Sequence, residues 1–309
     1  MNMANIPKNH CYVCTLTKEQ IALLKEILCA ASCELKAAPY CEFKTEYHEA
    51  SIAAYSSGKL VVQGKGTGEF VDFLLEPQIL KEDAFAGMIA ESEFFPHAGI
   101  DESGKGDFFG PLVIACVFVE DRAAAEKLAS LGVRDSKAIK SDAKIAQIAQ
   151  QILPAVNGQA AVVAIGPEAY NRFYDNIRNL NRLLAWGHAR TLENLLEKVP
   201  ACTSALADKF GDERLIRNAL MEQGRKIELR QQTKAESDIA VAAASILARA
   251  EFVRRMSLLG KEVGMELPKG AGPQVDKVAR SLAEQGGRAL LSTVAKMHFS
   301  TAAKALGQK

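Results

Sequence analysis

The stretch GIDESGKGDFFGPLVIACVFVE, residues 99–120, decides the fold of the larger part of this chain. It nearly spells a phosphate-binding P-loop, G-x-x-x-x-G-K, but Gly106 stands where that motif has Ser or Thr. A P-loop also leads into a helix whose N-terminus holds the phosphates. Here Pro111 is followed by a β-branched apolar run, residues 112–119, which predicts a strand. We therefore expect two strands joined by a glycine-rich loop.

Acidic residues accompany the ends of several apolar runs. Asp101 and Glu102 close the first predicted strand, Asp208 closes another run, and Glu236 and Asp238 precede an alanine-rich helix. Each acid alone is more simply explained as a helix cap or an ion-pair partner. Four converging carboxylates, however, cannot all ionise cheaply without divalent cations. Since hard oxygen ligands suit Mg²⁺ or Mn²⁺, the combination predicts a site for these ions.

The glycine-rich loop gives this acidic site a way to hold a substrate. Gly104 and Gly106 let backbone groups approach a ligand closely, and Lys105 between them can meet a phosphate. Backbone groups can also contact a ribose 2′-hydroxyl, which distinguishes RNA from DNA. Two divalent ions would clamp the attacking water and the leaving oxygen of a phosphodiester. These residues together predict a metal-dependent nuclease.

Composition limits the alternatives. The chain has 309 residues, 48% of them hydrophobic, and a net charge of +1, so any nucleic-acid site must be a local patch. Seven cysteines fit a reducing compartment better than a disulfide framework. We expect no membrane span and no signal peptide, and hence a cytoplasmic protein. Cys11 and Cys14 form a C-x-x-C, but residues three apart on a strand point to opposite faces, which argues against a zinc site.

Two domains are predicted, residues 1–88 and 89–309. The first has a helix over 17–30, strand-like runs over 41–63 and a second helix over 69–80, which predicts a small α+β domain. The second alternates strands with helices and ends in a helical region, which predicts an α/β domain with a central mixed sheet and flanking helices.

Five blocks of the second domain carry a resemblance to a known family. They are Asp101–Val113 (DESGKGDFFGPLV), Asp135–Lys137 (DSK), Lys234–Arg249 with its AAASILAR segment, Leu267–Gly272 (LPKGAG) and Lys296–Phe299 (KMHF). Together they resemble the signature of bacterial ribonuclease HIII over residues 97–300. Residues 10–80, with GKLVVQGKG at 58–66, look more loosely like the N-terminal domain of that family, which is similar to a TATA-binding-protein half-fold.

The resemblance implies an RNase H-like fold and an endonuclease that hydrolyses the RNA strand of RNA/DNA hybrids, leaving 5′-phosphate and 3′-hydroxyl ends. It also implies Mg²⁺ or Mn²⁺ as cofactor and, as metal-binding and catalytic residues, Asp101, Glu102, Asp208 and Glu236. We further expect Gly104, Lys105, Gly106, Ser136 and Lys137 to bind substrate. In the first domain, Lys59 and Lys65 flank a strand beside the exposed amides of Gly64 and Gly66 and could hold phosphates, the alternative being that both lysines are solvated surface residues. Asp238 stays an alternative to Glu236, because the spacing to the following alanine block is about one residue shorter than the family pattern. The expected partner is an RNA/DNA hybrid, with no membrane and no obligate protein partner, and we expect a monomer.

Other functions remain open from the sequence. A relative, ribonuclease HII, acts on single ribonucleotides embedded in DNA and usually has Arg where Lys105 stands. A DNA nuclease could use the same acids, and a protein that binds hybrids without cutting them is a third possibility. The acids present in all three segments argue against the last of these.

Overall fold

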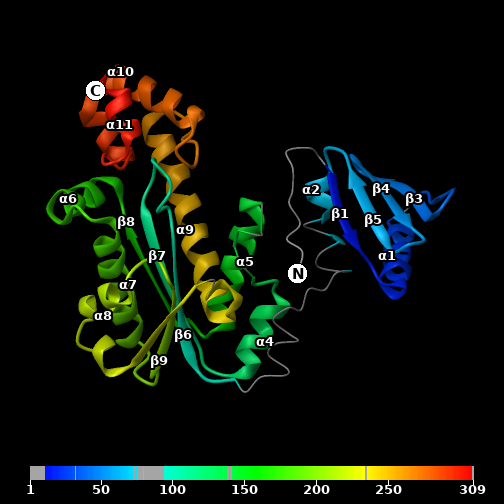
Figure 1. The fold of residues 1–309 in the computed structure, drawn as a ribbon, viewed down its shortest axis with the longest axis horizontal. Helices are drawn as coiled ribbons and strands as arrows, with labels where there is room; N and C mark the ends of the chain where they lie inside the picture. The colour runs from blue at the N-terminus through cyan, green and yellow to red at the C-terminus, as the bar shows by residue number, and fades with distance from the viewer. Residues whose placement is uncertain are drawn as a thin grey trace. The chain divides into compact units, whose positions relative to one another are not determined.

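The computed structural model describes residues 11–31, 33–71, 74–75, 79, 94–134, 136–137, 139, 141–233 and 235–307. The chain divides into two compact units, Met1–Ala84 and Phe85–Lys309 (Figure 1). The predicted domain boundary between residues 88 and 89 lies outside the described residues, as does half of the helix predicted over 69–80, so both remain predictions.

The N-terminal unit is a small α+β module, as predicted. Its described elements are β1 (Cys11–Thr15), α1 (Lys18–Ala30), β2 (Lys36–Ala38), β3 (Cys41–Tyr47), β4 (Ala50–Tyr55), β5 (Lys59–Gln63) and α2 (Thr67–Phe70). The strands form one antiparallel sheet in the order β1-β5-β4-β3-β2. Thr17 caps α1 in a reciprocal pair with Gln20, so the helix begins where a Thr followed three residues later by Gln predicts it.

The two faces of this N-terminal sheet differ. Alternate residues such as Ile52, Leu60 and Val62 are fully buried and pack in one core with Leu24 and Leu28 of α1. Their neighbours along the strands lie on the opposite face, because successive side chains of a strand alternate. The residues of that second face are intermediate or exposed, and they include Val13, Ser51, Ala53, Lys59, Val61 and Gln63. We call this second face the open face.

The C-terminal unit holds a second sheet between helices. Its described strands are β6 (His97–Ser103), β7 (Leu112–Val119), β8 (Ala160–Ile165), β9 (Ser204–Asp208) and β10 (Glu228–Gln232). Its α-helices are α4 (Arg122–Ser130), α5 (Asp142–Ala155), α6 (Pro167–Ile177), α7 (Leu180–Leu196), α8 (Glu213–Ala219), α9 (Ile239–Val263), α10 (Pro273–Val294) and α11 (Ser300–Ala305), with 3₁₀ turns η2 (Gly224–Lys226) and η3 (Ala235–Ser237).

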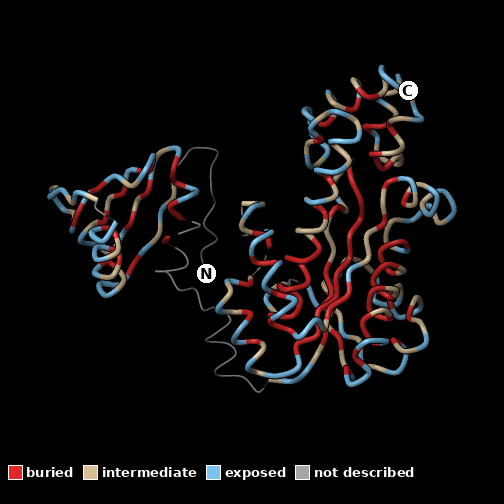
Figure 2. The backbone as a smooth tube through the Cα atoms, turned by 180° about the vertical axis from the view of Figure 1, so that it is seen from behind, coloured by how far each residue is buried: buried red, intermediate tan, exposed pale blue. Residues whose placement is uncertain are grey.

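The second sheet is mixed, in the order β10-β9-β6-β7-β8. β10, β9 and β6 run parallel, whereas β7 and β8 are antiparallel to their neighbours. Every residue of β7 is buried, and its side chains alternate between two cores. One core includes α5 and α9, and the other includes α7, so helices cover both faces of the sheet (Figures 1 and 2). This confirms the predicted α/β architecture.

Helix α9 lies unusually close to β6. A Cβ atom added to Gly99 would come within 2.1 Å of backbone atoms of Ala240 and Val241. The following residues of α9, Ala242 to Ala244, are alanines with no exposed surface. The glycine and the alanines therefore let the helix backbone pack directly on the strand backbone, which positions α9 relative to the acids of β6.

Some predicted boundaries move. Residues 225–230 (RKIELR) have a strand-like sequence, but residues 224–226 form the 3₁₀ turn η2 and β10 starts only at Glu228. The alanine-rich helix expected after Glu236 and Asp238 is α9, which continues to Val263 and ends at Gly264 in the left-handed conformation. The helical C-terminal region is confirmed by α10 and α11. Among the described helices, none has the length and apolar character needed to cross a membrane.

Candidate active site

The parallel strands bring three of the predicted segments to one edge of the second sheet. β6 pairs with β9 so that Ile100 lies opposite Ala207, which places Asp101 beside Asp208. β10 pairs with β9 so that Gln232 lies opposite Asp208, and Glu236 follows shortly after this strand in η3. Parallel strands end at the same edge of a sheet, so the four predicted metal ligands gather there.

The pleat of β6 separates the two neighbouring acids. Successive side chains of a strand point to opposite faces. Asp101 contacts Ser245 of α9 on one side of the sheet, and Glu102 contacts His188 of α7 on the other. Each acid is thus held by a different helix, although the two are adjacent in the chain.

Asp101 is a buried carboxyl group, 8% exposed. Its Oδ1 accepts a hydrogen bond from the Glu102 amide at 2.7 Å. The Ser245 hydroxyl also bonds to it, and Ser245 Oγ lies 2.7 Å from Ser136 Oγ. Burial, followed by the nearby charges of Glu102 and Asp208, raises the pKa of Asp101 to about 7 despite these hydrogen bonds. An additional positive charge at this edge would therefore stabilise its ionised form.

The pKa of Glu102 shifts in the opposite direction to that of Asp101. Burial would raise its pKa, but the hydrogen bond and charge of His188, with Lys105, outweigh burial and hold the pKa below its usual value. Its Oε2 lies 2.9 Å from His188 Nε2, and its Oε1 lies 3.7 Å from Lys105 Nζ. Glu102 is consequently the ionised member of the adjacent pair.

Asp208 and Glu236 form the more open side of the site. Oδ1 of Asp208 accepts a hydrogen bond from the Ala235 amide at 3.2 Å, which ties the end of β9 to η3. Burial, and then the charges of Glu236 and Glu102, raise the pKa of Asp208. Glu236 Oε1 lies 3.6 Å from the exposed Lys137 ammonium. The electrostatic coupling of Asp208 to both glutamates links the two sides of the site.

Asp238, the alternative to Glu236, caps a helix in this structure. It is the N-cap of α9, and its Oδ1 accepts hydrogen bonds from the amides of Ala240 at 2.9 Å and Val241 at 3.1 Å. Its Oδ2 lies 2.9 Å from His97 Nε2. Burial would lower the pKa of His97, but the hydrogen bond and charge of Asp238 raise it overall. Both oxygens of Asp238 are engaged, which favours Glu236 as the fourth acid.

The donor set fits a hard divalent cation. All four groups are carboxylates, the ligands that Mg²⁺ and Mn²⁺ accept. Burial first, and then the charges of neighbouring acids, raise the pKa values of Asp101 and Asp208, so a cation bound there would favour their ionised forms. Within the part of the chain that the structure describes, no three His, Cys, Asp or Glu side chains are already grouped as a metal site. This fit therefore rests on ligand chemistry and charge.

The predicted substrate-binding residues of this unit fall into two groups. Lys105 lies at the site beside Glu102, with its ammonium 5.5 Å from the centre of the Phe210 ring, and an added Cβ at Gly106 would meet no atom within 4 Å. That open space is available to a ligand. Ser136, in contrast, is buried and its hydroxyl faces Ser245 rather than solvent. The geometry gives Ser136 a supporting position behind Asp101.

The predicted lysines of the N-terminal unit are exposed. Lys59 lies on the open face of that sheet, and Lys65 lies in the turn after β5. The sequence also suggests that Gly64 and Gly66 expose their amides for phosphate binding. The structure differs, because the Gly66 amide donates to the Glu49 carbonyl at 3.1 Å and is already used. The lysines remain the candidates for a phosphate contact in this unit.

Sequence reasoning missed His188, Ser245 and Phe210 as site residues. His188 has no exposed surface and contacts both Glu102 and the Phe210 ring, whose centroid lies 4.9 Å from its own. One signal could have found it: His188 stands four residues from Leu184 and from Leu192, on the buried stripe of α7. A polar residue on such a stripe needs a partner, and here the partner is an acid of the site.

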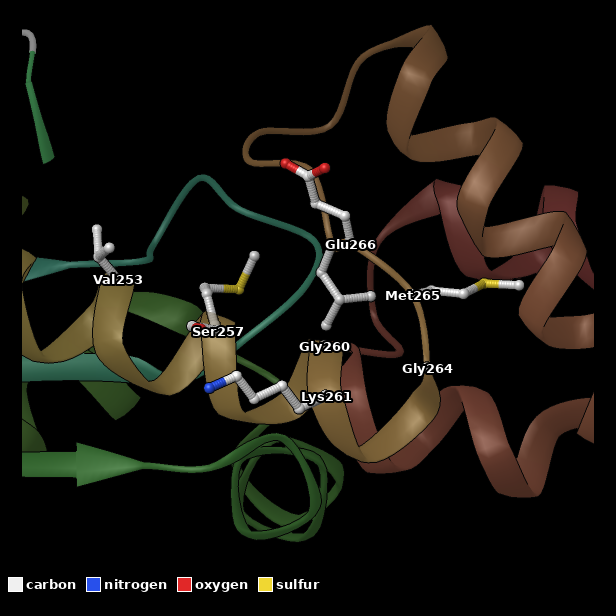
Figure 3. A pocket seen from close by; sticks show the side chains of 9 residues that line it. Val253, Ser257, Gly260, Lys261, Gly264, Met265 and Glu266 are labelled. Atoms are coloured by element: carbon white, nitrogen blue, oxygen red, sulfur yellow. The ribbon is translucent and has the colours of Figure 1, made fainter.

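A hollow of about 500 Å³ lies elsewhere in the unit, at the C-terminal end of α9 (Figure 3). Its lining includes Val253, Met256 and Ser257 of α9 and the following segment around Met265 and Glu266. None of the predicted site residues lines this hollow. The acidic edge of the sheet, rather than this hollow, therefore holds the groups suited to chemistry.

Comparisons with known proteins agree with this geometry. Residues 98–302 match a family model described as Ribonuclease HII, and residues 11–84 match a domain of unknown function, DUF3378. The chain is 42% identical to a ribonuclease HIII of Protochlamydia amoebophila, over 87% of this chain and 88% of that protein. It is 40% identical to a ribonuclease HIII of Chlamydia felis, over 94% of this chain and 95% of that protein.

A solved structure extends the likeness to the fold. The crystal structure of Bst-RNase HIII in complex with Mn²⁺ aligns with a TM-score of 0.65 at 30% identity, covering 96% of this chain and 98% of that one. RNase HII from Archaeoglobus fulgidus, in a complex with PCNA, aligns with a TM-score of 0.56 at 28% identity, over 69% and 97%. The chain therefore belongs to the ribonuclease HIII family of ribonuclease H enzymes.

Proposed function

We propose that this ribonuclease H cuts the RNA strand of RNA/DNA hybrids endonucleolytically and leaves 5′-phosphate and 3′-hydroxyl ends. The metal ligands in this proposal are Asp101, Glu102, Asp208 and Glu236. One observation carries it: acids from three separate segments meet at one sheet edge, where Asp101 and Asp208 have raised pKa values. The crystal structure of a relative in complex with Mn²⁺ supports Mn²⁺ or Mg²⁺ as the cofactor.

Divalent cations held by these acids would supply Lewis acidity for a bound water and for the leaving oxygen of the phosphodiester. The chain's own residues prepare the site. His188 and Lys105 hold Glu102 in its ionised form, and Ser245 orients Asp101. Lys105 and Lys137 each bring an ammonium to the acidic edge, where it can offset phosphate charge. In this arrangement the acids bind the metal ions, and the lysines contact the phosphates of the nucleic acid.

The choice of RNA is assigned to the Gly104–Gly106 turn. Because the space beside Gly106 is open, backbone groups of the turn can reach a ribose 2′-hydroxyl. A turn that contacts several consecutive riboses gains discrimination from each of them. A single embedded ribonucleotide offers one such contact, so we expect it to be cut more slowly than a run of ribonucleotides.

The N-terminal unit is proposed to bind the hybrid. Lys59, together with Lys36 and Lys44, projects from the open face, since these positions share its strand parity. Lys65 adds an exposed ammonium in the turn beyond β5. Lysines bind nucleic acid through phosphates and without sequence preference. The unit thus suits a long substrate of any sequence.

The proposal requires only one chain, since all the proposed ligands come from it, and a monomer remains our expectation. A cytoplasmic location likewise remains a prediction from cysteine usage.

End-labelled duplexes test the proposal. The purified chain is incubated with Mg²⁺ or Mn²⁺ and RNA/DNA, RNA/RNA, DNA/DNA and a DNA duplex with one embedded ribonucleotide. The expected result is internal cleavage of the RNA strand in the RNA/DNA duplex, lost with EDTA, and 3′ ends that a polymerase extends. Faster cleavage of the embedded ribonucleotide would favour the alternative of a ribonuclease HII-like enzyme. Cleavage of DNA/DNA would overturn the proposal.

A further inference from the structure

Lys296 is a lysine with no exposed surface, behind the glycine-rich loop of the active site. Lysines are almost never fully buried unless they are paired. In the described part of the chain, the hydrogen bonds of its ammonium all go to backbone carbonyl oxygens, and the nearby charge of Asp107 only partly offsets the effect of burial on its pKa. Its burial therefore requires another explanation.

The ammonium binds backbone carbonyls. Lys296 Nζ donates hydrogen bonds to the carbonyl oxygens of Asp107 at 2.8 Å, Gly110 at 2.8 Å and Phe109 at 3.3 Å. A lysine ammonium has three N–H donors and no acceptor. All three donors are thus directed at one short stretch of chain, the loop between β6 and β7.

The main chain of the same region holds this loop as well. The Lys296 amide donates to the Phe108 carbonyl at 2.9 Å, and the Gly110 amide donates to the Val294 carbonyl at 2.8 Å. Phe109 and Ala295 form an antiparallel bridge between these bonds. Lys296 therefore holds the loop twice, through its side-chain ammonium and through its own backbone amide.

The Asp107–Gly110 stretch supports the Gly104–Gly106 turn, which the proposed function assigns to substrate binding. The Asp107 amide donates to the Gly104 carbonyl at 3.3 Å, and Asp107 Oδ1 accepts a hydrogen bond from the Gly270 amide at 2.6 Å. Lys105 and Gly106 lie between these two ends of the turn. Any movement of the Asp107–Gly110 stretch would therefore displace the Gly104–Gly106 turn.

Burial of this ammonium is costly. Burial lowers the pKa of Lys296 to about 7, although the charge of Asp107 acts in the opposite direction. The other polar groups that face it offer little: the Tyr170 ring centre is 5.7 Å away, and His298, whose pKa is lowered to about 4 by burial and by Lys296, adds no anion. A methionine would fill a similar volume without the cost of desolvating a charge. Unlike methionine, lysine can donate hydrogen bonds to the three carbonyl oxygens.

We propose that Lys296 is a positioning residue for the cleavage reaction. Its ammonium bonds to backbone carbonyls and to none of the proposed metal ligands. Its ammonium fixes the Asp107–Gly110 stretch, and through it the Gly104–Gly106 turn is kept in the conformation that receives the hybrid. This inference rests on the proposed role of that turn in substrate binding.

The test compares Lys296→Met with Lys304→Met, which removes an exposed lysine of α11. We expect Lys296→Met to raise KM for an RNA/DNA hybrid about tenfold, with kcat changed less than threefold, while Lys304→Met leaves both unchanged. Lys296→Gln, which keeps two donors, should fall between wild type and the methionine variant. This ranking distinguishes the loss of hydrogen bonds from the loss of volume.

Hydrogen exchange supplies a readout that needs no activity. Peptides covering residues 104–111 should exchange faster in Lys296→Met than in wild type, while peptides from β7 and α9 keep their protection. Unchanged exchange in 104–111, or a KM within twofold of wild type, would overturn the inference. Faster exchange throughout the unit in both Lys296 variants would also overturn it, because it would assign Lys296 to general stability. Wild type that fails to cut hybrids would instead refute the proposed function, with the exchange result still readable.

Discussion

The described residues form two sheets of five strands each, and the two sheets differ in what surrounds them. The N-terminal sheet is antiparallel, packs one face on α1 and leaves the other face open. The sheet of the C-terminal unit is mixed, and cores cover both of its faces. Charged side chains stand on the open face of the first sheet, whereas in the second they meet at the edge where the parallel strands end.

The difference separates two kinds of function. An open face can contact a long, repetitive ligand through many weak interactions, each of them exposed to solvent. An edge between two covered faces can hold a few carboxylates in a partly buried setting, where their pKa values shift. We therefore expect changes in the second sheet to affect turnover and changes in the first to affect binding.

The largest expected effect is that of Asp101→Asn. The substitution keeps the shape of a buried side chain but removes a proposed metal ligand, so kcat should fall by about 10²–10³-fold or more. Binding of an RNA/DNA hybrid should change little, because ground-state contacts remain. Single-turnover cleavage and filter binding measure the two effects. Cleavage within tenfold of wild type would contradict the metal assignment.

The next effect distinguishes Glu236 from Asp238. Glu236→Gln should reduce kcat strongly at saturating Mg²⁺ with little change in Tm. Asp238→Asn should retain most activity, and its altered helix cap and the missing charge beside His97 should cost up to about 1 kcal/mol of stability. Turnover and thermal unfolding of both variants check this. The reverse ranking of activity would make Asp238 the fourth ligand.

Removal of residues 1–88 should act on binding. KM for a long hybrid should rise strongly, with a smaller change in kcat, because the proposed metal ligands all lie in the other unit. Circular dichroism would check that the remaining chain folds. A truncated enzyme that binds as tightly as the full chain across a salt series would leave the N-terminal unit a structural role only.

Two lysine pairs sharpen that result. Lys59→Ala with Lys65→Ala should weaken binding and reduce the slope of log K against log salt by about 0.9 for each phosphate that no longer meets a lysine. Lys18→Ala with Lys25→Ala, on exposed positions of α1, changes the net charge equally but leaves the open face intact. Equal slopes for the two double variants would indicate a general charge effect rather than a binding face.

A last effect concerns the stability of the metal-free protein rather than cleavage or binding. The folded pKa of Asp101, about 7, lies above its usual 3.8, so the folded chain keeps a proton that the unfolded chain has released. The contribution of Asp101 to the stability of wild type should therefore fall as pH rises from about 4 to 7. With EDTA at pH 8, Asp101→Asn should be more stable than wild type by roughly 2–4 kcal/mol, and at pH 3 the difference should vanish. Tm values that are equal at both pH values would contradict the charge explanation.

Local sequence was sufficient for the strand–loop–strand of residues 97–120, because a β-branched apolar run after Pro111 admits one interpretation. The gathering of acids also followed from the sequence, since each closes or follows an apolar run. The helix partners of those acids did not. His188 lies 86 residues from Glu102 in the chain, and no local pattern joins them.

The choice between Glu236 and Asp238 depended on cap geometry, which a spacing argument alone left open. Ser136 shows a similar limit. Its block predicted a contact with substrate, but the hydroxyl faces Ser245 in the interior. The sequence block indicated that Ser136 belongs to the site. Only the packing of α9 showed that Ser136 contacts Ser245 in the interior rather than the substrate side of Asp101.

The direct backbone contact between Gly99 and α9 has a consequence for how this enzyme can change over time. The separation between β6 and α9 is set by main-chain atoms, which are identical for every amino acid, rather than by interlocking large side chains. Drift in the surrounding core, such as exchanges among Val, Ile and Leu, therefore leaves the spacing between Asp101 and Ser245 unchanged. A library that exchanges the buried apolar residues of α5 and α10 among Val, Ile and Leu should yield many active enzymes, whereas one that randomises position 99 should yield almost none. The fold thus concentrates its intolerance to mutation in a few small residues and leaves most of its interior free to evolve.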